Sequence, residues 1–217
     1  MNGPLDEREG FAAFLLRARA EGITSRDLIA ALEATPRKSF VPVQWQSECW
    51  SKGMLPIECG EAIEGVDLQA RALAALDIQP GQKVLEIGTG SGFTAAVIGR
   101  LAGRVLTLER YKTLCDLARQ RHEALALGNV IVRQADGAAG APADGPFDRI
   151  IAWAAYPELP RLLADQLSTG GVMIAPIGRD EEKQSLARLA KVGSRFERTD
   201  VGTVRLQPVA AGLAQAI

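Results

Sequence analysis

The chain has 217 residues, with 25 Lys and Arg against 26 Asp and Glu, and it is 47% hydrophobic but only 5% aromatic. This length is enough for one domain with a sizeable core. A net charge of −1 gives no long-range attraction to phosphate backbones or anionic lipids, and the few aromatic residues disfavour stacking on bases. We therefore expect no nucleic-acid partner and no membrane partner.

The cysteine and histidine content excludes several kinds of site. The three cysteines form no CxxC pair and His122 is the single histidine, so a Cys/His zinc site and a disulfide framework are both disfavoured. His122 has polar neighbours on an expected helix, which predicts a surface position. Residues 1–8 contain no basic region followed by an apolar run, and no apolar stretch reaches ~18 residues. The sequence therefore predicts a cytoplasmic protein without a metal site.

The N-terminal third is predicted to be helical apart from one long irregular segment. Apolar residues recur at helical spacing over residues 11–18 and 28–32, and a further helix is expected at about 67–76. Residues 36–66 are rich in Pro and Gly and show little periodicity. Because such segments in compact domains are usually functional or linkers, we expect residues 1–78 to form a helical cover on the substrate side.

From Gln82 onward, strand-like runs alternate with helical stretches. Strands are expected at 83–87, 105–109, 130–133, 149–153 and 172–177, helices at about 92–102, 112–127 and 157–168, and a final strand hairpin at 185–192 and 201–209. Strand–helix–strand alternation implies parallel strands joined by right-handed crossovers. We therefore predict an α/β fold in which residues 79–217 form a doubly wound, mostly parallel seven-stranded Rossmann-like sheet with an N-terminal helical extension.

A glycine-rich turn follows the first strand of this sheet, in the sequence Glu86-Ile87-Gly88-Thr89-Gly90-Ser91-Gly92. In open α/β sheets, ligands bind beyond the carboxyl ends of strands, where glycines permit close approach and a helix N-terminus presents free N–H groups. The spacing departs from the dinucleotide pattern G-x-G-x-x-G, because position 93 is Phe. Glu86 would repel a pyrophosphate, so the turn favours a cationic or amine-bearing ligand.

Two more acids are expected at the ends of neighbouring strands. Glu109 ends the second strand, where an acid can accept hydrogen bonds from both hydroxyls of a ribose, and Asp136 follows the third, where it can accept from an adenine amino group. Together with the glycine-rich turn, these acids resemble the S-adenosylmethionine site of class I methyltransferases. The resemblance implies S-adenosylmethionine as cofactor, bound by Glu86, Gly88, Thr89, Gly90, Ser91, Gly92, Glu109, Arg110, Asp136 and Gly137.

The chain also resembles protein-L-isoaspartate O-methyltransferases nearly from end to end. The resemblance rests on ordered motifs, which are Pro36-Arg37-Lys38-Ser39-Phe40-Val41-Pro42, Leu55-Pro56-Ile57, Phe147-Asp148-Arg149-Ile150-Ile151-Ala152-Trp153-Ala154-Ala155 and Val204-Arg205-Leu206-Gln207-Pro208-Val209. Membership of this family implies methylation of the carboxylate of damaged, isoaspartyl-type residues in a protein or peptide substrate. The oligomeric state stays open between monomer and homodimer.

One segment departs from the family pattern near the site of methyl transfer. The family has Gly-Gln-Thr-Ile-Ser-Gln-Pro over the cofactor, and residues 60–66 of this chain keep Ile63 but have Glu64 in place of the serine. Trp153 likewise stands where the family has Thr. The resemblance therefore points to Ile63 and Glu64 as catalytic-site residues. An ionised Glu64 about 4 Å from an anionic acceptor would cost roughly 1 kcal/mol in water and ~4 kcal/mol at an effective dielectric of 20.

Glu64 leaves three functional hypotheses open. The first is isoaspartyl methylation by an altered site, which is unaffected if Glu64 points to water. The second is a methyltransferase of the same family with an amine or hydroxyl acceptor, such as an unknown small molecule, where Glu64 serves as base or binds a cationic substrate. The third is a cofactor-binding protein without transfer activity. Arg37 is expected either to bind a backbone carboxylate of the substrate or to pair with an acid.

Overall fold

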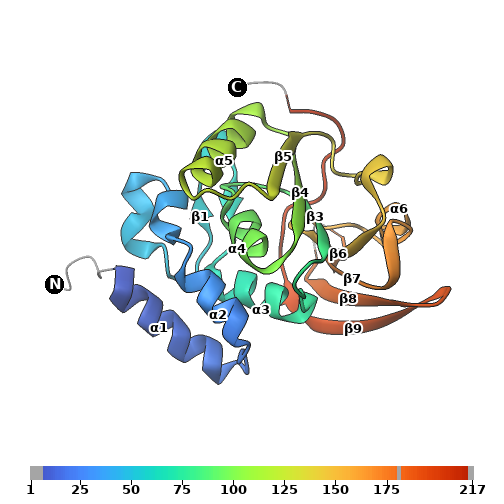
Figure 1. Cartoon of the computed structure of the whole chain (residues 1–217), viewed down its shortest axis with the longest axis horizontal. Coiled ribbons are helices and arrows are strands. Elements are labelled where there is room, and N and C mark those ends of the chain that lie inside the picture. Colours follow the sequence, from blue (N-terminus) through green and yellow to red (C-terminus); the bar gives the residue numbers. More distant parts are fainter. Residues whose placement is uncertain (1–6, 180–181, 215–217) are drawn as a thin grey trace.

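The computed structural model describes residues 7–179 and 182–214 (Figure 1). The expectation of a cytoplasmic protein rests in part on the sequence of residues 1–8, of which 1–6 lie outside the described residues. No helix within the two described ranges is long and apolar enough to cross a membrane. Those ranges also contain no group of three or more His, Cys, Asp and Glu side chains arranged to hold a metal ion.

Seven strands form one sheet in the order β5-β4-β3-β6-β7-β8-β9. Their bounds are β3 Lys83–Ile87, β4 Arg104–Glu109, β5 Val130–Gln134, β6 Phe147–Ala152, β7 Leu167–Ile177, β8 Gln184–Val192 and β9 Arg195–Val204. The pairs from β5 to β7 are parallel, whereas β8 pairs antiparallel with β7 and with β9. The predicted seven-stranded, mostly parallel sheet is confirmed, including the hairpin at its edge.

Six helices lie along the described residues, and all but the last occupy the predicted places. The helices are α1 Glu7–Ala20, α2 Arg26–Glu33, α3 Val66–Leu76, α4 Phe93–Leu101, α5 Lys112–Ala124 and α6 Arg161–Ala164. Figure 1 shows α1 and α2 beside α3 and α4, away from the β8–β9 hairpin. The irregular segment of residues 36–66 contains 3-10 turns and a short hairpin, in which the two-residue strand β1 (Leu55–Pro56) pairs with the two-residue strand β2 (Ala62–Ile63).

The sheet separates two hydrophobic cores because successive side chains of a strand point to opposite faces. In β3, Val84 belongs to one core and Leu85 to the other. The core that contains Val84 also includes Phe14 of α1, Leu32 of α2 and Leu73 of α3. The helices of residues 7–78 therefore share their main apolar core with one face of the sheet.

Two of the predicted elements are placed wrongly. The helix expected at 157–168 is reduced to α6, which begins after Pro160, because Pro160 disfavours helical backbone at the preceding residue. Residues 167–171 extend β7 instead. The last strand is β9, which starts six residues before the predicted start at 201, directly after a turn that contains Gly193 with φ 60°. The alternation of strands and helices is otherwise as predicted.

The predicted surface position of His122 is also wrong. The residue is 3% exposed, and its Nε2 lies 2.8 Å from the carbonyl oxygen of Gly92. Cys115 and Ala118 are buried on the same face of α5, at a spacing of three to four residues along the helix. Burial lowers the pKa of His122, so the neutral ring is favoured. His122 therefore supports the glycine-rich turn through its contact with the backbone of Gly92.

Candidate active site

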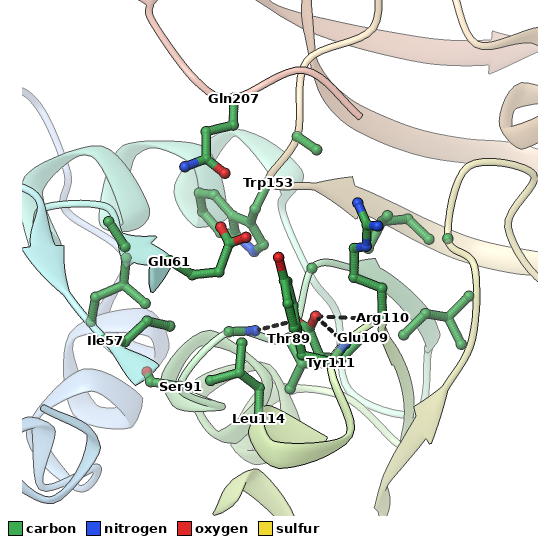
Figure 2. Close-up of a pocket in the computed structure, with 18 of the residues that line it drawn as sticks. Ile57, Glu61, Thr89, Ser91, Glu109, Arg110, Tyr111, Leu114, Trp153 and Gln207 are labelled. Atoms are coloured by element: carbon green, nitrogen blue, oxygen red, sulfur yellow. Dashed lines mark hydrogen bonds between the residues drawn. The ribbon is translucent and has the colours of Figure 1, made fainter. Parts of the chain in front are cut away.

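A pocket opens at the carboxyl ends of β3 and β6, where the strand order of the sheet reverses (Figure 2). Ligands bind at this topological switch point in open α/β sheets. Of the site residues predicted from the sequence, the pocket is lined by Ile63, Glu64, Gly88, Thr89, Gly90, Ser91, Glu109, Arg110 and Gly137. Segments that are far apart in the chain therefore meet in one cavity.

The glycine-rich turn has the backbone conformation that its composition predicts. Gly88, Gly90 and Gly92 have φ values of 89°, 52° and 87°, in the left-handed region that favours glycine. Gly88 and Gly90 line the pocket, whereas Gly92 caps α4. A Cβ on Gly92 would lie 2.9 Å from Ala118 Cβ and from His122 Nε2. The first two glycines shape the ligand side of the turn, and the third allows α5 to approach.

Glu109 is held in place by three backbone N–H groups. Its Oε2 accepts from Gly90 N at 2.9 Å, and its Oε1 accepts from Arg110 N at 2.8 Å and from Tyr111 N at 3.1 Å (Figure 2). Burial raises the pKa of Glu109, and the three N–H donors oppose that rise. A carboxylate has about four acceptor positions, so Glu109 retains capacity for a hydroxyl group in the pocket.

Asp136 does not line the pocket. Its carboxylate is exposed and accepts hydrogen bonds from Ala138 N at 2.9 Å and from Gly212 N at 2.7 Å, and these bonds lower its pKa. Asp136 thus ties the segment near the C-terminus to the end of β5. The adjacent Gly137 does line the pocket, and a Cβ there would lie 2.6 Å from Ile87 Cγ2.

Glu86, the acid that precedes the glycines, is completely buried and does not line the pocket. Its carboxylate accepts hydrogen bonds from Thr94 Oγ1 at 2.5 Å, Thr107 Oγ1 at 2.7 Å and Trp153 Nε1 at 2.9 Å. Burial raises the pKa of Glu86 to about 7. Protein donors therefore occupy most of the Glu86 carboxylate, and Trp153, not Glu86, lines the pocket wall.

Glu64 and Ile63 both line the pocket and are buried. Glu64 is 7% exposed, so the interpretation of a loop acid that points to water is wrong. Burial raises the pKa of Glu64 to about 7, with a smaller contribution from the charge of Glu86 and against the opposing effects of its own backbone N–H and of Arg37. A substantial fraction of Glu64 is therefore neutral near pH 7, which reduces its repulsion of another carboxylate.

Arg37 is a structural residue, contrary to both sequence interpretations. Its guanidinium donates to Cys49 O at 2.5 Å, Gln69 Oε1 at 2.5 Å and Glu64 O at 3.0 Å. The side chain is fully buried, and burial lowers its pKa to about 10. Arg37 thus joins the irregular segment to α3 and fixes the backbone of Glu64 through its carbonyl oxygen.

The burial of Glu64 predicts a characteristic pH dependence of the free energy of unfolding. Because the pKa of Glu64 rises from 4.5 to about 7 on folding, the folded state holds this proton more tightly than the unfolded state does. The protonated Glu64 therefore adds about 3 kcal/mol to the free energy of unfolding. This contribution is fully present below pH 4.5 and is lost as pH rises through 7. Glu64→Gln should therefore match the parent at pH 5 and exceed its free energy of unfolding at pH 8, as measured by urea denaturation. Parallel stability profiles would contradict this assignment.

Gly65 lies where the backbone of the preceding loop packs against the site segment. A Cβ on Gly65 would lie 2.0 Å from Lys52 O, a backbone atom that cannot rotate away. We expect Gly65→Ala to lower the free energy of unfolding by about 3 kcal/mol, measured by urea denaturation. Gly128→Ala is the control, because a Cβ there meets nothing within 4 Å. Equal effects of the two substitutions would contradict this packing.

Sequence reasoning missed several pocket residues. Glu61 and Tyr111 line the pocket and interact, and the Glu61 carboxylate raises the pKa of the tyrosine (Figure 2). Residues 207–210 cross the pocket from the C-terminal part of the chain. Glu61 stands at the family's Gln in the divergent segment, and Gln207-Pro208 lies in the last family motif. Both positions lie within the family motifs, but no local sequence pattern predicts that their side chains line this cavity.

The sheet order, the glycine-rich turn and the strand-end acid Glu109 define the class I methyltransferase fold. Solved structures support this class. One protein-L-isoaspartate O-methyltransferase superposes with a TM-score of 0.80 at 24% identity, over 96% of this chain and 67% of that one. A PCMT protein from Plasmodium falciparum, solved in complex with S-adenosyl-L-homocysteine, has a TM-score of 0.77 at 20% identity, over 91% and 97% of the two chains.

The chain belongs to the protein-L-isoaspartate(D-aspartate) O-methyltransferase (PCMT) family, whose model matches residues 11–214. A protein-L-isoaspartate O-methyltransferase of Rhizobium meliloti (strain 1021) is 47% identical over 199 residues, which are 92% of this chain and 98% of the relative. Another, from Maricaulis maris (strain MCS10), is 42% identical over 94% of this chain and 95% of its own length.

Proposed function

We propose that this chain is an S-adenosylmethionine-dependent methyltransferase that methylates the carboxylate of isoaspartyl-type residues in proteins or peptides. The observation that carries the proposal is the hydrogen bond from Gly90 N of the glycine-rich turn to Glu109 at the switch point of the sheet, in a chain of the PCMT family. Residues 1–78 serve as the cover on the substrate side.

The residues present fit this cofactor. Glu109 lines the pocket, and among the described residues its Oε2 has one donor, Gly90 N, so that a ribose hydroxyl can also donate to this carboxylate. Ser91 Oγ is buried, has no hydrogen-bond partner among the described residues, and belongs to a pocket-lining residue. Gly137 leaves no room for a side chain beside Ile87. We assign cofactor contacts to Gly88–Ser91, Glu109, Arg110 and Gly137, and assign Gly92 and Asp136 to supporting the site.

The reaction requires positioning more than proton transfer. S-adenosylmethionine, when bound, supplies a sulfonium methyl group open to in-line displacement by a carboxylate oxygen. An aspartyl-type carboxyl has a reference pKa near 4 and is already ionised at neutral pH, so no general base is needed. Ile57 and Ile63 provide apolar walls that exclude water, and Arg37 fixes the Glu64 backbone at the edge of this space. Ile63 and Glu64 are thus assigned to the methyl-transfer region.

The partners and location follow from the same proposal. The substrate is a protein or peptide that carries a damaged aspartyl residue, and the protein acts in the cytoplasm without nucleic acid or membrane as partner. Repair of spontaneously altered proteins is the corresponding role.

A transfer assay tests the proposed activity. The protein is incubated with methyl-labelled S-adenosylmethionine and an isoaspartyl peptide, and the label is then exposed to mild base. We expect label that is lost in base, because methyl esters hydrolyse under these conditions. Label that survives base would instead support an amine or ether product, and no label with intact cofactor binding would support a protein without transfer activity.

A further inference from the structure

Trp153 separates the acid of the glycine-rich motif from the pocket. Its indole Nε1 donates to Glu86, whose carboxylate already accepts from Thr94 and Thr107. Glu86 is fully buried and absent from the pocket wall, whereas Trp153 lines it. Three of about four acceptor positions of this carboxylate are therefore occupied by protein donors. Glu86 is poorly placed to bind an amino group of a ligand.

Glu64 is a carboxylate that does line the wall. The residue before it, Ile63, lies beside the glycine-rich turn, because a Cβ on Gly90 would lie 3.4 Å from Ile63 Cγ2. Arg37 donates to the backbone carbonyl oxygen of Glu64, not to its carboxylate, although its charge favours the ionised form. Among the described residues, no side chain donates a hydrogen bond to the Glu64 carboxylate, whose partner is its own backbone N–H. A buried carboxylate of this kind is stabilised by a cation in the pocket.

Glu61, the other acid of the divergent segment, also lines the pocket. Its carboxylate interacts with the Tyr111 side chain, and its charge contributes to the raised pKa of Glu109. Figure 2 shows the side chains of Glu61 and Tyr111 directed toward the same part of the cavity. Glu61 therefore has a protein partner in Tyr111, whereas the Glu64 carboxylate accepts no side-chain hydrogen bond among the described residues.

We infer that Glu64 binds the ammonium group of the amino-acid part of the cofactor, in place of the motif acid Glu86. The inference rests on the proposed function and assigns a role to two departures from the family pattern at once. Trp153 covers Glu86, and Glu64 supplies a carboxylate at the pocket surface. When Glu64 is protonated before binding, its O–H bond breaks and water takes up the proton as the ammonium group arrives, and no bond between heavy atoms forms or breaks.

A pair of ligands isolates the contact with the ammonium group. Calorimetry measures binding of S-adenosylhomocysteine and of its analogue in which the amino group is replaced by hydrogen. We expect the parent protein to prefer the amino ligand by at least about tenfold, the order expected for a charge-assisted hydrogen bond. Glu64→Gln should bring the two affinities within about twofold, whereas Glu61→Gln and Glu86→Gln should each keep the preference. Trp153→Thr, added to Glu64→Gln, should restore part of it by opening Glu86.

Each outcome bears on the inference. Loss of the preference in Glu61→Gln or Glu86→Gln, or its retention in Glu64→Gln, would overturn it. Glu64→Ser, which restores the family residue, gives a second test should Glu64→Gln fail to fold, and it should also lose the preference. If the parent binds neither ligand, the proposed function itself fails, whereas tight and equal binding of both ligands by the parent overturns only the role of Glu64.

Discussion

Glu109→Ala should weaken the binding of S-adenosylhomocysteine by about 1–3 kcal/mol, a factor of about 5 to 150 in Kd. The physical reason is the loss of a buried carboxylate acceptor that lines the pocket and is fixed by the Gly90, Arg110 and Tyr111 N–H groups. Isothermal titration calorimetry at constant salt measures the change directly. Because the contact is made to the nucleoside, adenosine should lose affinity in proportion.

Two further variants define the expected pattern for Glu109. Glu109→Gln keeps one acceptor oxygen and should show a smaller loss than Glu109→Ala. Glu123→Ala removes an exposed acid from the outer side of α5 and should leave the affinity unchanged. An unaltered Kd in Glu109→Ala would contradict the assignment of this strand end to the nucleoside.

Arg37→Met should lower the free energy of unfolding by about 3–5 kcal/mol, the usual cost of removing one member of a buried polar network. The substitution leaves Cys49 O, Gln69 Oε1 and Glu64 O without their donor inside the protein. It also removes the guanidinium that lies 4.4 Å from the centre of the Phe93 ring. Urea denaturation monitored by tryptophan fluorescence measures the loss.

Lys38→Met is the matched control for Arg37→Met, because Lys38 is the next residue, carries the same charge and is exposed. Its effect should stay within about 0.5 kcal/mol. A similar stability for both variants would mean that Arg37 does not join the irregular segment to α3.

Local patterns predicted the elements of this fold that depend on neighbouring residues. The glycine-rich turn, the strand that precedes it and the strand-end position of Glu109 each follow from residues close together in the chain, and the structure has all three. The parallel arrangement of most strands follows from crossover rules, which limit how alternating strands and helices can be connected. These features account for the class I methyltransferase fold and for the location of the pocket.

The details that determine the chemistry depend on contacts between distant segments. The bond from Trp153 to Glu86 joins β3 to the residue that follows β6, 67 positions away in the chain. Asp136 is tied by a bond to Gly212, 76 positions away. Neither contact leaves a periodic signal in the sequence, so both acids were expected to face the ligand. Burial of Glu64 likewise depends on how Arg37 holds the irregular segment against α3.

These contacts explain how the site segment accommodates an acid at position 64. The sequence alone presented Glu64 as an obstacle to a carboxylate acceptor. The structure places it in a buried wall, where its pKa is about 7 and where Glu86 is covered by Trp153. A carboxyl group that is partly neutral, or paired with a ligand cation, leaves room for an anionic acceptor nearby.

A competition assay tests the central claim most directly. An isoaspartyl peptide and its aspartyl isomer are mixed in equal amounts with the protein and methyl-labelled S-adenosylmethionine, and the peptides are then separated. The account predicts base-labile label on the isoaspartyl peptide, with a ratio of kcat/KM values above about 100. Equal labelling of the two isomers, or label that is stable to base, would contradict it.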